Sequence, residues 1–288
     1  DIRRDSELVR ECIEYCLDIG QLTIEDISSI AICTPWNLCK FDDSEIFHII
    51  GGTPTNYVGT FYVPHHFAHA EYIVHYGDLR PGLVLVVDGS GSRELDRNLF
   101  NVNENLDANC MQFINSLGRE VISAYWFDGK ALFLVYRSSP TTIVPGSHNG
   151  LLQSIGHYWE WASQYCCGSR NEAGKVMGLA AFGKKAKEKE DPILWVSNNG
   201  QINVDYDLIQ SKYSNPNVFK EELTDNNYYA DIALKVQNET EVSLLKLLQL
   251  LVKKWPCDTL YLSGGVALNV VANEKIIRSK IFENVILN

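Results

Sequence analysis

An unbroken run of five apolar residues at 83–87, LVLVV, leads directly into the small, polar segment DGSG at 88–91. A short continuous apolar run of this kind is typical of a buried strand. A buried strand that ends in Asp-Gly and small residues commonly presents its backbone amides to a phosphate. The sequence therefore predicts a core strand followed by a candidate anion-binding turn.

The remaining pattern alternates between helices and strands. Helices are predicted at residues 5–19, 64–77 (beginning at Pro64), 150–165, 171–183 and 228–254, and strands at 28–34, at 83–87 and in a hairpin over 119–137. The long helix places apolar side chains at Ile232, Leu234, Val236, Val242, Leu244, Leu248 and Leu251. A strand, a glycine pair and a helix follow over 258–277, and the final residues begin another strand.

The order of these elements predicts the fold class. The hairpin, with Asp128-Gly129 as its turn, argues against a purely parallel sheet. Two α/β lobes with mixed sheets, roughly residues 1–150 and 151–288, and a cleft between them suit the pattern. Residues 190–227 are polar, and we expect an irregular excursion over the surface there.

Composition narrows the class of function. The 288 residues carry a formal net charge of −11, which argues against a nucleic-acid surface because phosphate binding requires clustered Lys and Arg. Eight cysteines occur without a CxxC pair, a pattern typical of buried free thiols in a reducing cytosol. No apolar run reaches about 18 residues, so we expect a soluble, cytoplasmic protein without a membrane span.

The segment VPHHFAHAEY at 63–72 holds three histidines. On a helix, His65 and His69 share a face, whereas His66 is rotated away by about 100 degrees. Two imidazoles four residues apart either hold one divalent cation or simply cap and hydrogen-bond. A carboxylate from another element favours the cation, and Asp88 is such a candidate; a His–His–Asp set suits Fe, Mn or Zn.

Two further segments offer phosphate-binding groups. Gly264 and Gly265 lie between a strand and a helix, where a ligand can approach the backbone and the helix N-terminus favours anions. Asn269, one turn into the helix, is placed to hydrogen-bond a sugar or a base; a purely structural turn remains the alternative. Lys175, among small and apolar residues, either reaches a phosphate or extends along a closely packed helix to solvent.

Taken together, these segments resemble a known family. VPHHFAHA, VLVVDGSGSRE, NEAGKVMGLAAFG and YLSGGVALNVVANEKI occur in the order seen in the NodU/CmcH-type O-carbamoyltransferases, and the resemblance covers roughly residues 1–97 and 118–288. The family's catalytic domain is similar to TsaD, the tRNA threonylcarbamoyl transferase. The resemblance thus implies the two-lobed α/β fold of the actin, sugar-kinase and heat-shock-chaperone ATPases.

The resemblance also implies an activity. Such enzymes make carbamoyl adenylate from carbamoyl phosphate and ATP, and pass the carbamoyl group to a hydroxyl of a sugar or natural product in a biosynthetic reaction. It implies that His65, His69 and Asp88 are catalytic and bind a divalent metal, with iron as first choice and manganese or zinc as alternatives. The implied nucleotide contacts are Asp88, Gly89, Ser90, Gly91, Asn171, Lys175, Gly178, Gly183, Gly264, Gly265 and Asn269.

Several departures from the family pattern qualify this expectation. The family's opening strand and hairpin, a further metal-binding Asp expected just after ENVILN, and the adenylate-forming YrdC-like domain are not found in the sequence, so we expect a partial catalytic domain. The family's DGxGE motif reads DGSGSRE here, and residues 97–118 are predicted to be an insertion. Acceptor specificity is expected in residues 97–118 or 190–227.

Two other functions remain as alternatives. One is a TsaD-like enzyme that acts on tRNA, which tRNA binding would reveal. The other is a nucleotide-binding module without catalysis, which would keep its properties after His65→Ala and His69→Ala. The sequence leaves the acceptor and the oligomeric state open.

Overall fold

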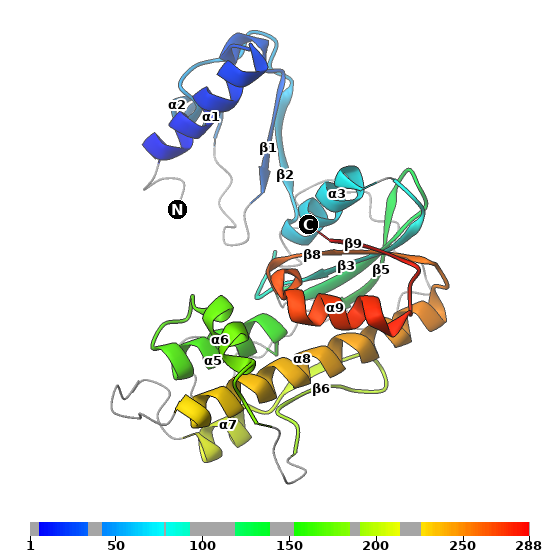
Figure 1. The fold of residues 1–288 in the computed structure, drawn as a ribbon. Helices are drawn as coiled ribbons and strands as arrows, with labels where there is room; N and C mark the ends of the chain where they lie inside the picture. Colours follow the sequence, from blue (N-terminus) through cyan, green and yellow to red (C-terminus); the bar gives the residue numbers. More distant parts are fainter. Residues whose placement is uncertain are drawn as a thin grey trace.

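A computed structural model describes residues 6–33, 42–77, 79–92, 119–138, 153–184, 191–213 and 226–287 (Figure 1). In chain order the elements are α1 (Ser6–Gly20), η1 (Ile24–Asp26), β1 (Ser29–Cys33), α2 (Asp43–Ile50), β2 (Gly59–Val63), α3 (His65–Tyr76), β3 (Gly82–Val87), β4 (Ile122–Phe127), β5 (Leu132–Ser138), α5 (Ile155–Cys167), α6 (Ala173–Ala180), β6 (Leu194–Val196), β7 (Ile202–Val204), α7 (Tyr206–Lys212), α8 (Asn226–Lys254), β8 (Thr259–Ser263), η2 (Gly265–Leu268), α9 (Val270–Ser279) and β9 (Asn284–Leu287).

A five-stranded mixed sheet forms the centre of the fold, with the strand order β5-β4-β3-β8-β9. β3 runs parallel to β8, and β8 runs parallel to β9, whereas β3, β4 and β5 are successively antiparallel. The mixed α/β class predicted from the hairpin is therefore confirmed. Strands from before and after residue 150 join this one sheet, so the sheet crosses the predicted boundary between the two lobes. The division into lobes itself stays a prediction.

The apolar run of β3 explains why the sheet has helices on both faces. Alternate side chains of a strand point to opposite faces. Leu83, Leu85 and Val87 belong to the core cluster shared with α5, α8 and α9. Val84 and Val86 instead pack with residues of α3 on the other face. All six residues of β3 are buried, as the continuous apolar pattern predicts.

The first part of the chain forms a smaller unit, seen at the top of Figure 1. β1 and β2 pair in parallel, with Cys33 opposite Val63, and α1 packs against α2. β2 leads through Pro64 into α3, which begins at His65 with Pro64 as its N-cap, one residue later than predicted. The end of β1 therefore lies beside the start of α3.

The helix α8 already begins at Asn226, and the prediction of an irregular excursion over 190–227 is also wrong for residues 191–213. This stretch contains the hairpin of β6 and β7 followed by α7. Side chains from all three elements, among them Leu194, Val204 and Ile209, belong to the main core. Each strand has three residues, a length too short for apolar alternation to be recognised. The hairpin is held to α8 by Glu239, whose carboxylate accepts hydrogen bonds from the amides of Ile193 (3.1 Å) and Leu194 (3.0 Å).

Three smaller expectations can be compared with the structure. The predicted helix over 228–254 is confirmed, but Val242 is 66% exposed rather than buried. The described cysteines are free thiols, and Cys12, Cys16 and Cys33 are exposed, contrary to the expected burial. Within the described residues, no helix has the length and apolar character needed to cross a membrane.

Candidate functional site

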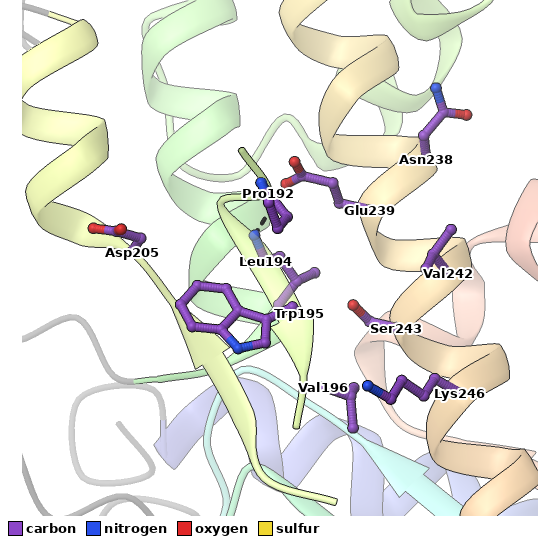
Figure 2. A pocket seen from close by; sticks show the side chains of 10 residues that line it. All are labelled: Pro192, Leu194, Trp195, Val196, Asp205, Asn238, Glu239, Val242, Ser243 and Lys246. Carbon is purple, nitrogen blue, oxygen red and sulfur yellow. Dashed lines mark hydrogen bonds between the residues drawn. The ribbon is translucent and has the colours of Figure 1, made fainter. Parts of the chain in front are cut away.

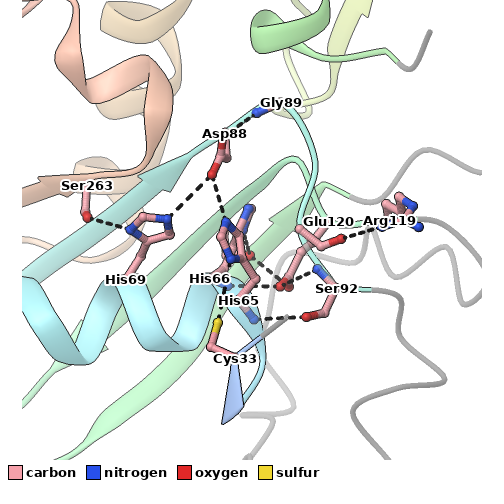
Figure 3. A network of polar contacts seen from close by, with 12 residues as sticks. Cys33, His65, His66, His69, Asp88, Gly89, Ser92, Arg119, Glu120 and Ser263 are labelled. Carbon is pink, nitrogen blue, oxygen red and sulfur yellow. Dashed lines mark hydrogen bonds and ion pairs between the residues drawn. The ribbon is translucent and has the colours of Figure 1, made fainter. Parts of the chain in front are cut away.

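Two histidines and one aspartate meet where α3 begins and β3 ends (Figure 3). Asp88 Oδ2 lies 3.0 Å from His65 Nε2 and 3.6 Å from His69 Nε2. One ligand atom from each of the three side chains lies within 4.8 Å of the others. We call these three residues the histidine cluster. The structure thus brings together the residues proposed from sequence as a metal site.

Local sequence explains this convergence. His65 and His69 are one helical turn apart on α3, so their imidazoles share a face. Ala70 and Ile73, on the side of α3 next to this face, are fully buried and pack the helix on the sheet. Asp88 follows the buried strand β3 directly, and its backbone amide donates to Val121 O at 3.0 Å. Packing of α3 on β3 therefore sets the position of the histidines relative to the aspartate.

The charges of the cluster are coupled. Burial alone would lower the pKa of His65, but hydrogen bonds to Asp88 and Cys33 outweigh it and raise the pKa to about 9. Burial would raise the pKa of Asp88, but hydrogen bonds from His65, His69 and the Gly89 amide hold it well below its usual range. Asp88 is therefore a carboxylate at neutral pH.

These side chains fit a divalent metal. Both Nε2 atoms face the same carboxylate oxygen, and the second nitrogen of each ring has a partner: Cys33 Sγ for His65 and Ser263 Oγ for His69. Two imidazoles and one carboxylate are the donor set of sites that bind Fe, Mn or Zn and leave positions open for other ligands. The three side chains are between one-fifth and one-third exposed, so small molecules have access.

His66 lies on a different side of α3, as the helical rotation predicts. It is fully buried, and its Nδ1 lies 2.8 Å from Ser123 Oγ. Its backbone amide donates to Glu120 Oε1 at 3.2 Å. His66 therefore belongs to the support beneath the cluster rather than to its donors.

Glu120 is the centre of that support, and sequence reasoning missed it. Its carboxylate forms an ion pair with Arg137 at 2.7 Å, and both side chains are 1% exposed. It also accepts from the amide of Ser92 at 3.3 Å, while Ser92 Oγ accepts from the amide of His65 at 2.9 Å. The first turn of α3 is thus connected to a buried charge pair.

The position of Glu120 also clarifies the DGSGSRE departure. The Gly91 amide donates to Glu120 O at 2.6 Å, and the Glu120 amide donates to Ser92 O at 3.1 Å. Glu120 therefore lies next to the DGSG turn, while Glu94 of DGSGSRE lies outside the described residues. The sequence signal was GRE, which one residue, Val121, separates from the strand ISAYWF. The predicted insertion, 97–118, also lies outside the described residues.

A pocket of about 350 Å³ opens beside the cluster. Of the predicted nucleotide contacts, Asp88, Gly89, Gly265 and Asn269 line it. Asp88 thus belongs to both the pocket and the histidine cluster. An added Cβ at Gly265 would lie 3.0 Å from Asp88 Oδ1, so the absence of a side chain there lets the backbone approach the carboxylate closely.

Among the lining side chains not identified from sequence, one is aromatic and two are charged: Trp159, Glu160 and Arg170. Glu160 lies on α5 and has a pKa raised mainly by burial. His157, one turn earlier, has its pKa lowered to about 4 by burial and by the charges of Arg170 and Arg119. The sequence did not indicate Trp159, Glu160 and Arg170, because an aromatic-rich helix and an arginine in a loop have no motif of their own. The pocket therefore offers an indole, a carboxylate and a guanidinium.

Other predicted nucleotide contacts do not line the pocket. Lys175 is 70% exposed and forms an ion pair with Glu172 at 2.9 Å, so the structure does not bring it to a phosphate position. Asn171 and Gly178 are exposed. Gly183 packs against α8, where an added Cβ would lie 2.4 Å from Ala230 O. Close packing against α8 thus explains Gly183, and the ion pair with Glu172 explains Lys175, whereas nothing in the structure explains Gly178.

Two glycines of the predicted turns also have structural roles. Gly264 has a φ of +98°, and an added Cβ would lie 2.4 Å from Val87 O. At Gly91, an added Cβ would lie 2.7 Å from Glu120 Cγ and 2.8 Å from His66 Cδ2. Ser90 is half-buried beside them. Close packing around β3 accounts for both glycines without a ligand.

Asn269 organises one wall of the pocket. Its Oδ1 accepts from the amide of Ala272 at 3.0 Å, which caps α9. Its Nδ2 donates to Gln237 Oε1 at 2.9 Å, and Gln237 Nε2 donates back to Asn269 Oδ1 at 3.2 Å. The asparagine thus joins α8 to α9 and is 8% exposed.

A second, larger hollow of about 730 Å³ lies between β6 and α8 (Figure 2). Its walls include Trp195, which is 38% exposed, and Val242. Glu239 and Lys246 add charge to it. It shares no lining residue with the pocket beside Asp88, so it is a separate feature of the surface.

Comparison with known proteins identifies the family. The model of the family described as carbamoyltransferase N-terminus matches residues 61–288. Among solved structures, the chain is similar to HypF from T. kodakarensis, with a TM-score of 0.49 and 14% identity over 98% of this chain and 40% of that one. The chain thus spans less than half the length of that protein. The match includes the whole histidine cluster and the pocket beside it, and because it extends over most of the chain, the chain belongs to the carbamoyltransferase N-terminus family.

Proposed function

We propose that this chain is the carbamoyl-transfer domain of a metal-assisted O-carbamoyltransferase. In this reaction a hydroxyl of a sugar or natural product attacks the carbonyl carbon of carbamoyl adenylate. The new bond joins the acceptor oxygen to that carbon, the bond from the carbon to the phosphate oxygen breaks, and AMP leaves as the anion. The hydroxyl proton passes to solvent or to a base. Family membership supports carbamoyl transfer in general; the acceptor class and the metal are part of the proposal.

The observation that carries this proposal is the double position of Asp88. One carboxylate oxygen faces both imidazoles, and the other accepts from the Gly89 amide at 2.7 Å beside the pocket. A nucleotide in the pocket and a metal on the histidine cluster would therefore adjoin the same side chain. Carbamoyl transfer from an adenylate needs this proximity, because the reacting carbonyl is attached to the nucleotide's phosphate.

Each part of the site then has a task. His65, His69 and Asp88 would hold the metal, which when bound would polarise the carbamoyl carbonyl or lower the pKa of the acceptor hydroxyl. Glu160 is placed to accept hydrogen bonds from hydroxyls, and Arg170 to balance phosphate charge. Trp159 offers an aromatic surface within the same pocket. We propose iron, with manganese or zinc as alternatives, and we propose a small-molecule acceptor rather than a nucleic acid.

Because Asp88 belongs to both the metal site and the pocket, the effect of a bound metal on nucleotide affinity tests the proposal. ATP affinity of the protein is measured by calorimetry with and without Mn²⁺, for the wild type and for Asp88→Asn. A metal and a nucleotide that share Asp88 should enhance each other's binding in the wild type, and this mutual enhancement should disappear in the variant. Asp128→Asn, in the exposed hairpin turn, is the matched control and should keep it. Equal enhancement in wild type and Asp88→Asn would refute the shared site.

Product analysis tests the reaction itself. The protein is incubated with Fe²⁺, carbamoyl adenylate and a panel of sugars and aminoglycosides, and carbamoylated products are sought by mass spectrometry. The expected result is a carbamoyl ester on at least one hydroxyl acceptor, lost in His69→Ala. A carbamoylated tRNA and unmodified small molecules would instead support the TsaD-like alternative.

A further inference from the structure

The side of each imidazole that faces away from Asp88 has its own polar partner (Figure 3). Cys33 Sγ lies 3.7 Å from His65 Nδ1, and Ser263 Oγ lies 3.3 Å from His69 Nδ1. Cys33 is the last residue of β1, and Ser263 is the last residue of β8. The two strands belong to different sheets, yet each places its last side chain beside the Nδ1 atom of one histidine.

This repeated arrangement has a physical meaning for a metal ligand. A neutral imidazole carries one proton, and it can bind a metal only through the nitrogen that lacks the proton. A partner that accepts a hydrogen bond from Nδ1–H keeps the proton on Nδ1 and leaves the lone pair on Nε2. The same bond fixes the rotation of the ring. Partners of this kind commonly change metal affinity 10- to 100-fold when they are removed.

We infer that Cys33 and Ser263 are positioning residues: each accepts from the Nδ1–H of its histidine when Nε2 holds a metal beside Asp88, and so fixes the rotation of the ring. This inference rests on the metal centre of the proposed function and deepens it. Neither residue was singled out by sequence motifs. Cys33 also lies outside the segment that matches the family, residues 61–288, so its position depends on the pairing of β1 with β2.

Burial distinguishes the two partners. Ser263 is fully buried, whereas Cys33 is exposed. After Ser263→Ala, water has no ready access to His69 Nδ1 from that side, so the proton loses its acceptor. After Cys33→Ala, water can take the place of the thiol. We therefore expect the larger effect from Ser263→Ala.

The experiment measures Co²⁺ affinity and tautomers in the whole chain. Co²⁺ binding is followed through its visible absorption, in competition with a chelator of known affinity. Expected losses of affinity are about 100-fold for Ser263→Ala and about 10-fold for Cys33→Ala. Cys33→Ser keeps an acceptor and should recover the wild-type affinity. ¹⁵N NMR of the Zn²⁺-loaded protein should show Nδ1–H and a metal-bound Nε2 for both imidazoles in the wild type, and a mixture of ring states in the alanine variants.

Two matched controls separate positioning from general damage. Cys16→Ala removes an exposed thiol from α1, and Ser243→Ala removes a buried hydroxyl that has no hydrogen-bond partner in the described part of the chain. Both should bind Co²⁺ like the wild type. If the wild type binds Co²⁺ and Cys33→Ala and Ser263→Ala bind it equally well, the inference about the two partners is overturned but the metal centre is not. No Co²⁺ binding by the wild type would overturn the metal centre and, with it, the inference.

Discussion

The buried pair of Glu120 and Arg137 provides the sharpest prediction about stability. Glu120→Gln keeps the shape of the side chain and an oxygen that can accept from the amides of Ser92 and His66. It removes the charge that compensates Arg137, whose side chain is 1% exposed. Removing one member of a buried ion pair typically costs about 3–5 kcal/mol, because the remaining charge is left uncompensated in a medium of low polarity. We expect a loss of this size for Glu120→Gln.

The double variant Glu120→Gln/Arg137→Met isolates the cause. It leaves no uncompensated charge and retains the acceptor for the two amides, so most of the lost stability should return. The coupling free energy between the two positions should therefore exceed about 2 kcal/mol. The assay is urea unfolding followed by circular dichroism, with all four proteins of the cycle measured under one condition.

An exposed ion pair serves as the control for this cycle. Arg278 and Glu274 lie on the surface of α9, 75% and 59% exposed, at a distance of 2.6 Å. Removing either should cost at most about 1 kcal/mol. The reasoning is refuted if Glu120→Gln lies within 1 kcal/mol of the wild type, or if the double variant is no more stable than the weaker single variant.

Three further predictions follow from local geometry. Replacing residues 93–118 by a short Gly-Ser linker should preserve the circular dichroism spectrum and the Co²⁺ affinity. The reason is that Gly91 and Ser92, before this segment, are hydrogen-bonded to the backbone of Glu120 after it; loss of the fold would contradict this reasoning. Gly178→Ala, inside α6, has free space for the new methyl group and should raise stability by about 0.5–1 kcal/mol. Gly183→Ala, after the end of α6, should lower the melting temperature because its Cβ would meet α8; equal effects of the two changes would contradict this reasoning. Lys175→Met should leave ATP affinity unchanged in calorimetry, and a tenfold loss would restore the phosphate role expected from the sequence.

The long elements and the histidine cluster could be predicted because their signals are local. The helical pattern over 228–254, the apolar run at 83–87 and the Asp-Gly turn of the hairpin depend only on neighbouring residues. The spacing of His65 and His69 likewise depends on one helix. Asp88 was identified because it directly follows a strand that is recognisable by itself.

The supporting residues could not be predicted, because their roles depend on packing between distant segments. Glu120 has no motif once the insertion separates it from DGSG. Ser263 precedes a glycine pair that drew attention to a ligand rather than to the serine, Cys33 lies in no motif, and only the tertiary fold brings the two residues to the imidazoles. For Lys175, small and apolar neighbours left a phosphate role and an extension to solvent open; in the structure it pairs with Glu172, and the phosphate role stays a prediction.

The parallel pairing of β3 with β8 also determines when during folding the cluster can be complete. His69 and its partner Ser263 are 194 residues apart in the chain, and β8 is the strand that carries Ser263 beside β3. Contacts between such distant residues require closure of a long loop and tend to form late. A growing polypeptide would therefore already contain both histidines and Asp88 long before β8 leaves the ribosome. Tight metal binding should then appear only at the end of folding, so that the bound metal selectively stabilises the finished domain over its precursors.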